Sequence, residues 1–121
     1  MTVAQGKKTI LLVEDQRDIR EAMRELLELE GYLVMEAVHG KDALEALNWS
    51  RPSLVLLDMM MPVMDGARFL EEVAKRPALE KLPIVVVSAF HEGPLPKHAI
   101  GFLQKPCSAD SLLEAVARWA R

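Results

Sequence analysis

Five polar side chains of this chain have types that suit phosphoryl chemistry, and each stands where an apolar run ends. Glu14 and Asp15 follow "TILLV", Asp58 follows "LVLL", Ser88 follows "IVVV" and Lys105 follows "GFLQ". A carboxylate nucleophile, acids for a divalent ion, a hydroxyl and a lysine are the groups that phosphoryl transfer requires, because this chemistry depends on positioning and on neutralising charge. The question is whether the fold brings the ends of these runs together.

The apolar runs alternate along the chain with amphipathic segments. The runs are apolar throughout, which is typical of strands buried on both faces of a parallel sheet. The segments between them repeat apolar residues at helical spacing. This alternation predicts a doubly wound α/β fold with five parallel strands. We expect strands at residues 9–15, 32–37, 53–58, 82–89 and 101–105, and helices at 18–32, 40–50, 65–75 and 108–120.

The ligand site of such a sheet lies outside the carboxyl ends of its strands, so the five groups should converge on one edge. Three carboxylates a few ångströms apart repel one another by about 4 kcal/mol per close pair at an effective dielectric near 20. A cluster of this kind needs a cation, and oxygen donors alone favour Mg²⁺ or Mn²⁺ over zinc. Asp58 would then attack phosphorus in line, with the ion beside it and beside Glu14 or Asp15, and with Lys105 and Ser88 on other phosphoryl oxygens.

Each of these residues also has a simpler explanation when it is taken alone. A strand-end Asp58 is compatible with a turn or a helix cap, Glu14 and Asp15 with the start of a helix, and Lys105 with an exposed loop. The coincidence of four strand ends that all carry the required residue types favours the site.

Length, composition and charge limit the other function classes. The chain has 121 residues, of which 50% are hydrophobic and 27% charged, and its net charge is −3. Scattered basic residues give no stripe for nucleic acid or an anionic membrane, and no apolar run approaches the roughly 20 residues of a membrane helix. The polar N-terminus lacks a secretory signal, and the single cysteine, Cys107, fits a reducing compartment. We expect one cytoplasmic domain over residues 1–121, with a core at about 8–120, that binds neither nucleic acid directly nor membrane.

In combination, the motifs "LLVEDQ", "LLDMMMPVMDG", "VVSA" and "FLQKP" resemble the receiver domain of two-component response regulators over nearly the whole chain. The resemblance implies the CheY-like, flavodoxin-like fold. It implies phosphotransfer onto Asp58 from a sensor histidine kinase or a phosphotransfer protein, followed by action on an effector that the sequence does not identify. It also implies a switch rather than a turnover enzyme, which catalyses only its own Mg²⁺-dependent phosphorylation and dephosphorylation.

The resemblance also assigns roles around Asp58. It implies a Mg²⁺ ion held by Asp15, by Asp58 and by the backbone carbonyl of Met60, with Glu14 acting through water. Met60 and Phe90 lie two residues beyond Asp58 and Ser88, where family behaviour suggests that side chains gate water. Both are bulky and apolar, so we expect slow loss of the phosphoryl group, with mere packing over a loop as the alternative.

A second group of roles concerns the change of conformation. The resemblance assigns Ser88 the switch hydroxyl and Phe102 the aromatic side chain that turns inward with it, while Lys105 precedes a proline that is commonly in a cis peptide. The sequence departs from the family between Ser88 and Lys105, where "AFHEGPLPKHAIGFLQ" is about five residues shorter than usual. Glycine and prolines interrupt this interval, which predicts at most a short turn of helix at residues 96–100 where typical members have a full fourth helix.

Two other functions stay open on the sequence. A Mg²⁺-dependent phosphatase of the haloacid-dehalogenase type would also use an aspartyl phosphate, but it carries an acid where Met60 stands. A receiver-like module that signals by binding alone is consistent with the short interval before Lys105, but not with the intact set of five polar groups. Trp49 and Trp119 close predicted helices, and we expect them to cover edges of the core, with an exposed Trp119 at a partner surface as the alternative.

Overall fold

A five-stranded parallel sheet organises the chain. The computed structural model describes residues 8–61, 63–89 and 93–121. The strands stand in the order β2-β1-β3-β4-β5, and every neighbouring pair is parallel. They are β1 (Thr9–Val13), β2 (Leu33–Ala37), β3 (Leu54–Asp58), β4 (Ile84–Ser88) and β5 (Gly101–Gln104). The predicted doubly wound α/β architecture is confirmed.

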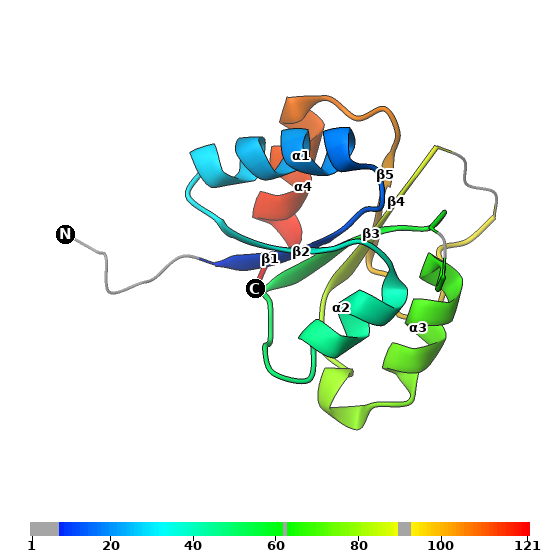
Figure 1. Cartoon of the computed structure of the whole chain (residues 1–121). Helices are drawn as coiled ribbons and strands as arrows, with labels where there is room; N and C mark the ends of the chain where they lie inside the picture. The colour runs from blue at the N-terminus through cyan, green and yellow to red at the C-terminus, as the bar shows by residue number, and fades with distance from the viewer. Residues whose placement is uncertain (1–7, 62, 90–92) are drawn as a thin grey trace.

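Helices cover both faces of this sheet. In the described residues they are α1 (Arg17–Leu29), α2 (Gly40–Ala46), α3 (Gly66–Ala74) and α4 (Ala109–Trp119), with a short 3₁₀ turn at Pro77–Leu79. Helices α1 and α4 pack on one face and α2 and α3 on the other (Figure 1). No helix of the described residues is long and apolar enough to span a bilayer.

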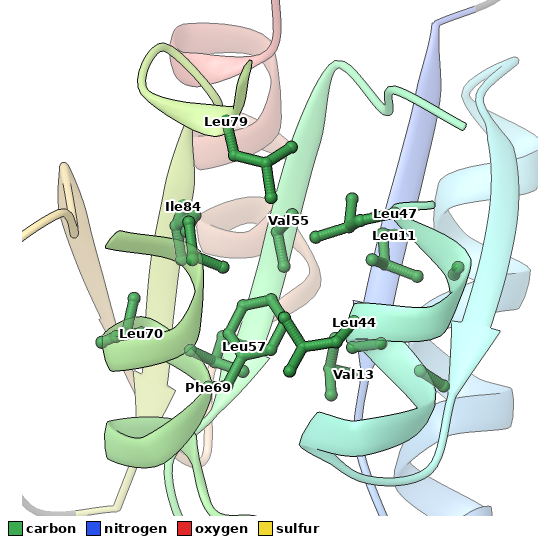
Figure 2. Close-up of a cluster of buried hydrophobic side chains, with 14 of the residues drawn as sticks. Leu11, Val13, Leu44, Leu47, Val55, Leu57, Phe69, Leu70, Leu79 and Ile84 are labelled. Carbon is green, nitrogen blue, oxygen red and sulfur yellow. The ribbon is translucent and has the colours of Figure 1, made fainter. Parts of the chain in front are cut away.

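The alternation of side chains along the buried strands produces two cores. Leu11 and Val13 of β1 point toward α2 and α3 and belong to the same buried cluster as Phe69 (Figure 2). Ile10 and Leu12 point to the opposite face, toward α1 and α4. All residues of β3 and β4 are buried. Burial on both faces explains why these strands are apolar throughout, and why a polar group is tolerated only at their ends.

Local capping sets the ends of several helices. Ser108 accepts a hydrogen bond from the backbone N–H of Ser111 at the start of α4, and Asp65 accepts one from Arg68 at the start of α3. Gly31 follows α1 with a φ of 96°, a left-handed conformation that glycine adopts without a steric penalty. Gly31 thus follows the end of α1 without strain, and Ser108 caps α4.

Helix α2 is shorter than its sequence pattern predicts. It ends at Ala46, whereas the pattern extends to residue 50. Trp49 therefore lies beyond the helix with 71% of its surface exposed, and the prediction that it covers the core edge is wrong. Trp119 lies at the end of α4 and packs against the α1/α4 core, as predicted.

The part of the β4–β5 connection that the structure describes includes residues 93–100, which lie in irregular backbone. Residues 93–100 contain no helix, and the backbone N–H of Ala99 donates to the carbonyl of Pro96 at 3.1 Å, which closes a turn. His98 occupies this turn with a φ of 76°. Within the described part of this interval, the predicted replacement of the fourth helix by a short turn is confirmed.

Candidate functional site

The register of the sheet brings the predicted polar residues to one edge. Asp58 is the last residue of β3 and Ser88 the last of β4, and Asp58 is paired with Val87 in the ladder. Glu14 follows β1 directly, and Lys105 follows β5. The backbone N–H of Lys105 donates to the carbonyl of Ser88 at 2.9 Å, which fixes the end of β5 beside that of β4.

Three carboxylates meet at this edge. Glu14, Asp15 and Asp58 each offer an oxygen, and these oxygens lie within 4.8 Å of one another. Glu14 and Asp58 are only 1% and 4% exposed, while Asp15 is half-buried. Like charges at this separation and burial are costly unless a cation or a proton compensates them.

One ammonium group provides part of that compensation. The Lys105 Nζ atom lies 2.7 Å from Glu14 Oε1 and 3.4 Å from Asp58 Oδ1. Burial lowers the pKa of Lys105, but the hydrogen bond and the charge of Glu14, together with Asp58, outweigh burial and raise its pKa overall. Lys105 is therefore a fixed positive charge at neutral pH. We call Glu14, Asp15, Asp58 and Lys105 the strand-end cluster.

Opposing effects act on the pKa of the Asp58 carboxyl. Burial is the main cause that raises its pKa, from 3.8 to about 6, and the charge of Glu14 adds to this effect. The backbone N–H of Met60, which donates to Asp58 Oδ1 at 3.2 Å, and the charge of Lys105 act in the opposite direction. Asp58 is thus mainly ionised at neutral pH, but its negative charge is not fully compensated by the protein.

Backbone contacts hold the two acids that follow β1. The N–H of Gln16 donates to Glu14 Oε2 at 3.1 Å. The Arg20 guanidinium donates to the carbonyl of Glu14 at 3.0 Å and more weakly to that of Asp15 at 3.5 Å, reaching back from the first turns of α1. The sequence reasoning did not identify Arg20, because an arginine on a helix surface carries no signal of a contact with a preceding turn.

The loop after Asp58 approaches the strand end closely. Gly66 donates its N–H to the carbonyl of Met59 at 3.2 Å. A Cβ atom at Gly66 would lie 2.5 Å from Met59 Sδ and 2.8 Å from Met59 Cα, so a side chain here would displace the loop. Met60, in contrast, is 78% exposed and stands at the mouth of the site.

The remaining predicted residues lie at different depths. Ser88 is buried at the end of β4. Phe102 is half-buried in β5 opposite Val86 and packs against the α2/α3 core. The Lys105–Pro106 peptide bond is cis. Phe90 lies outside the described residues, so the prediction that it gates water is not tested.

The acidic residues fit a hard divalent cation. The Asp15 Oδ1 atom is buried and has no hydrogen-bond partner, although buried polar atoms are normally satisfied. Three ionised carboxylates and one ammonium leave two negative charges in excess, which matches the charge of one Mg²⁺ ion. Carboxylate oxygens are the donors that such an ion prefers.

Comparisons with known proteins place these features in a family. The model of the response regulator receiver domain matches residues 10–117. The sporulation initiation phosphotransferase F of Bacillus subtilis is 33% identical, with 91% of each chain covered. The transcriptional regulatory proteins DctD of Rhizobium meliloti and PdtaR of Mycobacterium tuberculosis and the response regulator MprA of Mycolicibacterium vanbaalenii are longer, and this chain spans 25% to 55% of their length.

Solved structures agree with this result. The chemotaxis response regulator CheY4 of Vibrio cholerae is 29% identical and superposes with a TM-score of 0.84, covering 93% of this chain and 98% of its own. The receiver domain of the sensor histidine kinase PA1611 of Pseudomonas aeruginosa, which has a magnesium ion coordinated in its active site cleft, has a TM-score of 0.85 at 24% identity, with 94% and 98% covered. This second likeness concerns the fold alone.

Proposed function

We propose a function from one established premise: the chain belongs to the response regulator receiver domain family of two-component systems. It acts in the cytoplasm as a phosphoacceptor, and its partner is a sensor histidine kinase or a phosphotransfer protein that carries a phosphohistidine. Asp58 receives the phosphoryl group. The product is a modified protein in a different conformation, rather than a released small molecule.

The observation that carries this proposal is the environment of Asp58. Its carboxylate lies at a strand end, 3.4 Å from the Lys105 ammonium and within 4.8 Å of oxygens of Glu14 and Asp15. Its raised pKa and its incomplete compensation make it a stronger nucleophile than an exposed aspartate, because basicity and nucleophilicity rise together.

The transfer step needs few groups beyond these. An Asp58 oxygen attacks phosphorus in line and forms an O–P bond while the P–N bond to the donor histidine breaks. The electron pair of that bond stays on the imidazole nitrogen, which takes a proton. Lys105 and Ser88 contact phosphoryl oxygens and stabilise the charge that spreads over them in the transition state.

Asp15, Asp58 and the backbone carbonyl of Met60 would hold Mg²⁺, with Glu14 acting through water. Bound there, the ion supplies positive charge that neutralises carboxylates and phosphoryl oxygens together. The orphaned Asp15 Oδ1 and the excess of two negative charges support this assignment. Mn²⁺ offers the same preference for oxygen ligands.

The conformational change rests on Ser88 and Phe102. A phosphoryl group on Asp58 favours the state in which Ser88 moves toward it, and Phe102 follows into the space released. Phe102 lies on the sheet face that α2 and α3 share, next to the β4–β5 connection. Met60, exposed at the mouth of the site, and Phe90 would slow loss of the phosphoryl group by excluding water.

Phosphoramidate tests the proposal, because its P–N bond resembles that of a phosphohistidine. Incubation with phosphoramidate and Mg²⁺ should add one phosphoryl group to the intact protein by mass spectrometry. Asp58→Asn should abolish the gain, because an amide is not nucleophilic here. Asp65→Asn is the matched control, since Asp65 is an exposed helix cap, and it should be labelled like the wild type. Labelling of Asp58→Asn at the wild-type rate would overturn the assignment.

A further inference from the structure

A cavity between β2 and α2 takes no part in the site described above. It has a volume of about 290 Å³. Its walls come from β2, from α2 and from the residues that follow α2: Met35, Glu36, Asp42, Glu45, Ala46 and Trp49. Trp49 is 71% exposed, so its indole forms an open wall rather than part of the core.

Two carboxylates in this cavity lack a basic partner. Asp42 and Glu45 lie three residues apart on α2, so they share one face of the helix. Trp49, which follows α2, lines the same cavity. Across residues 8–61, 63–89 and 93–121, no lysine or arginine forms an ion pair with either. Arg51 reaches the end of α2, but it donates to the carbonyl oxygens of Leu47 and Ser50 instead.

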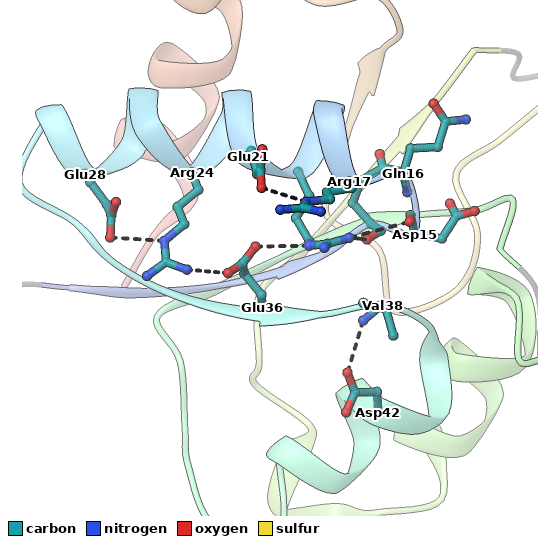
Figure 3. Close-up of polar contacts among 11 residues, drawn as sticks. Asp15, Gln16, Arg17, Glu21, Arg24, Glu28, Glu36, Val38 and Asp42 are labelled. Atoms are coloured by element: carbon teal, nitrogen blue, oxygen red, sulfur yellow. Dashed lines mark hydrogen bonds and ion pairs between the residues drawn. The ribbon is translucent and has the colours of Figure 1, made fainter.

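The other walls of the cavity are held in place. Asp42 Oδ2 accepts a hydrogen bond from the N–H of Val38 at 3.1 Å (Figure 3). Glu36 pairs with Arg20 and Arg24, so it adds a fixed polar wall but little free negative charge. The Ser50 hydroxyl donates to the carbonyl of Ala46 at 2.9 Å and lies 3.6 Å from Met35 Sδ. The cavity is therefore present before any ligand arrives.

The other tryptophan, Trp119, has a cationic partner within the chain, whereas none is found at Trp49 among the described residues. The Arg118 guanidinium carbon lies 5.5 Å from the centroid of the Trp119 ring, a cation–π contact within the chain. In the part of the chain that the structure describes, no cation occupies the same place at Trp49, although Trp49 is the more exposed ring and lines a cavity with two carboxylates that form no ion pair.

We propose that this cavity binds the guanidinium group of an arginine on a partner protein. A planar guanidinium stacks on an indole and pairs with carboxylates in the same plane, which a compact ammonium does less well. The arginine stem would contact the thioether of Met35 and the methyl group of Ala46. Leu33 and Val38, which are 50% and 41% exposed on the adjoining edge of the sheet, extend the surface beyond one side chain. This apolar surround favours a protein segment over a small cation.

Nuclear magnetic resonance titration of the ¹⁵N-labelled chain tests the proposal directly. The probe is the peptide acetyl-Gly-Gly-Arg-Gly-Gly-amide, with the citrulline and lysine peptides of the same length as comparisons. We expect saturable shifts at the Trp49 indole N–H and at the amides of residues 42–49. The arginine peptide should bind roughly fivefold more tightly than the uncharged citrulline peptide.

Two variants separate this cavity from general attraction of a cation. Trp49→Ala and Glu45→Gln should each weaken binding by roughly three- to fivefold, read at the amides of residues 42–48. Glu114→Gln removes an exposed carboxylate on α4 and should leave binding unchanged. Equal binding of the citrulline peptide, tighter binding of the lysine peptide, or unchanged binding by both cavity variants would overturn the proposal.

Discussion

Two clusters of charge lie on either side of the start of α1, and they are balanced in opposite ways. The surface ion-pair row, formed by Arg20, Arg24, Glu28 and Glu36, has two positive and two negative groups in contact (Figure 3). The strand-end cluster has three carboxylates and one ammonium. The first is complete within the protein, whereas the second has an excess of negative charge.

The two clusters also differ in burial, which determines how strongly their charges affect stability. Side chains of the row are between 15% and 46% exposed, whereas those of Glu14 and Asp58 are only 2% and 5% exposed. Water and salt screen Arg24 and Glu28, the exposed end of the row, so their ion pair contributes little to stability. The strand-end cluster is poorly screened and carries an electrostatic cost in the folded state. A site with excess negative charge is suited to binding a cation and, with it, a phosphoryl group.

The largest effect should come from removing the ammonium. Lys105→Met leaves three carboxylates together, so we expect it to lower the free energy of unfolding by about 3 kcal/mol at neutral pH without divalent ions. Urea unfolding in the presence of a chelator measures this change. A loss below about 1 kcal/mol, the size expected of an exposed pair, would mean that the strand-end cluster is no more demanding than the surface ion-pair row.

The second largest effect should be the pH dependence of the free energy of unfolding, which reflects the charges of the strand-end cluster. A carboxyl whose pKa is raised by folding, here from 3.8 to about 6 for Asp58, binds its proton more tightly in the folded state. The free energy of unfolding of the metal-free protein should therefore fall between about pH 4 and pH 7, by about 2–3 kcal/mol from this group. Asp58→Asn should remove this part of the fall. An unchanged pH profile in the variant would show that Asp58 is not the strained group.

Metal binding should recover part of this cost. Millimolar Mg²⁺ binds the folded state selectively, so we expect it to raise the free energy of unfolding by about 1–2 kcal/mol. Asp15→Asn should remove most of this increment, because Asp15 offers the buried oxygen without a partner. Calorimetric melting with and without Mg²⁺ measures both. An equal increment in the variant would place the ion elsewhere.

The smallest effect should come from the surface ion-pair row. Arg24→Met breaks the pairs with Glu28 and Glu36, yet it should cost only about 0.5–1 kcal/mol, because these groups remain solvated. Moderate salt should reduce even this difference. The same urea unfolding experiment provides the measurement, and a loss as large as that of Lys105→Met would remove the contrast between the two clusters.

The order of elements and the strand-end position of the acids could be predicted from the sequence, because both follow from patterns of residue type. Continuous apolar runs mark buried parallel strands, and a polar residue directly after such a run must lie at a strand end. The compact turn before β5 followed from its prolines and glycine in the same way.

Contacts that depend on the path or the exact end of a helix could not be predicted. Arg20 has the spacing of an ordinary helix-surface residue, and only the path of α1 relative to β1 shows that it reaches the carbonyl of Glu14. Trp49 continues the apolar pattern of α2, but the helix ends at Ala46, so the ring no longer points to the core. The position of these two side chains depends on where a helix runs and where it ends, and the local sequence pattern does not determine either.

The dependence of phosphoryl labelling on Mg²⁺ tests most directly whether the strand-end cluster needs a divalent cation for phosphoryl transfer. The mass gain from phosphoramidate should be rapid in the wild type with Mg²⁺, and slower by at least about tenfold with a chelator or in Asp15→Asn with Mg²⁺. That result would show that the strand-end cluster needs a divalent cation to work. Equal labelling rates of the wild type with Mg²⁺ and with a chelator would show that the strand-end cluster needs no divalent cation.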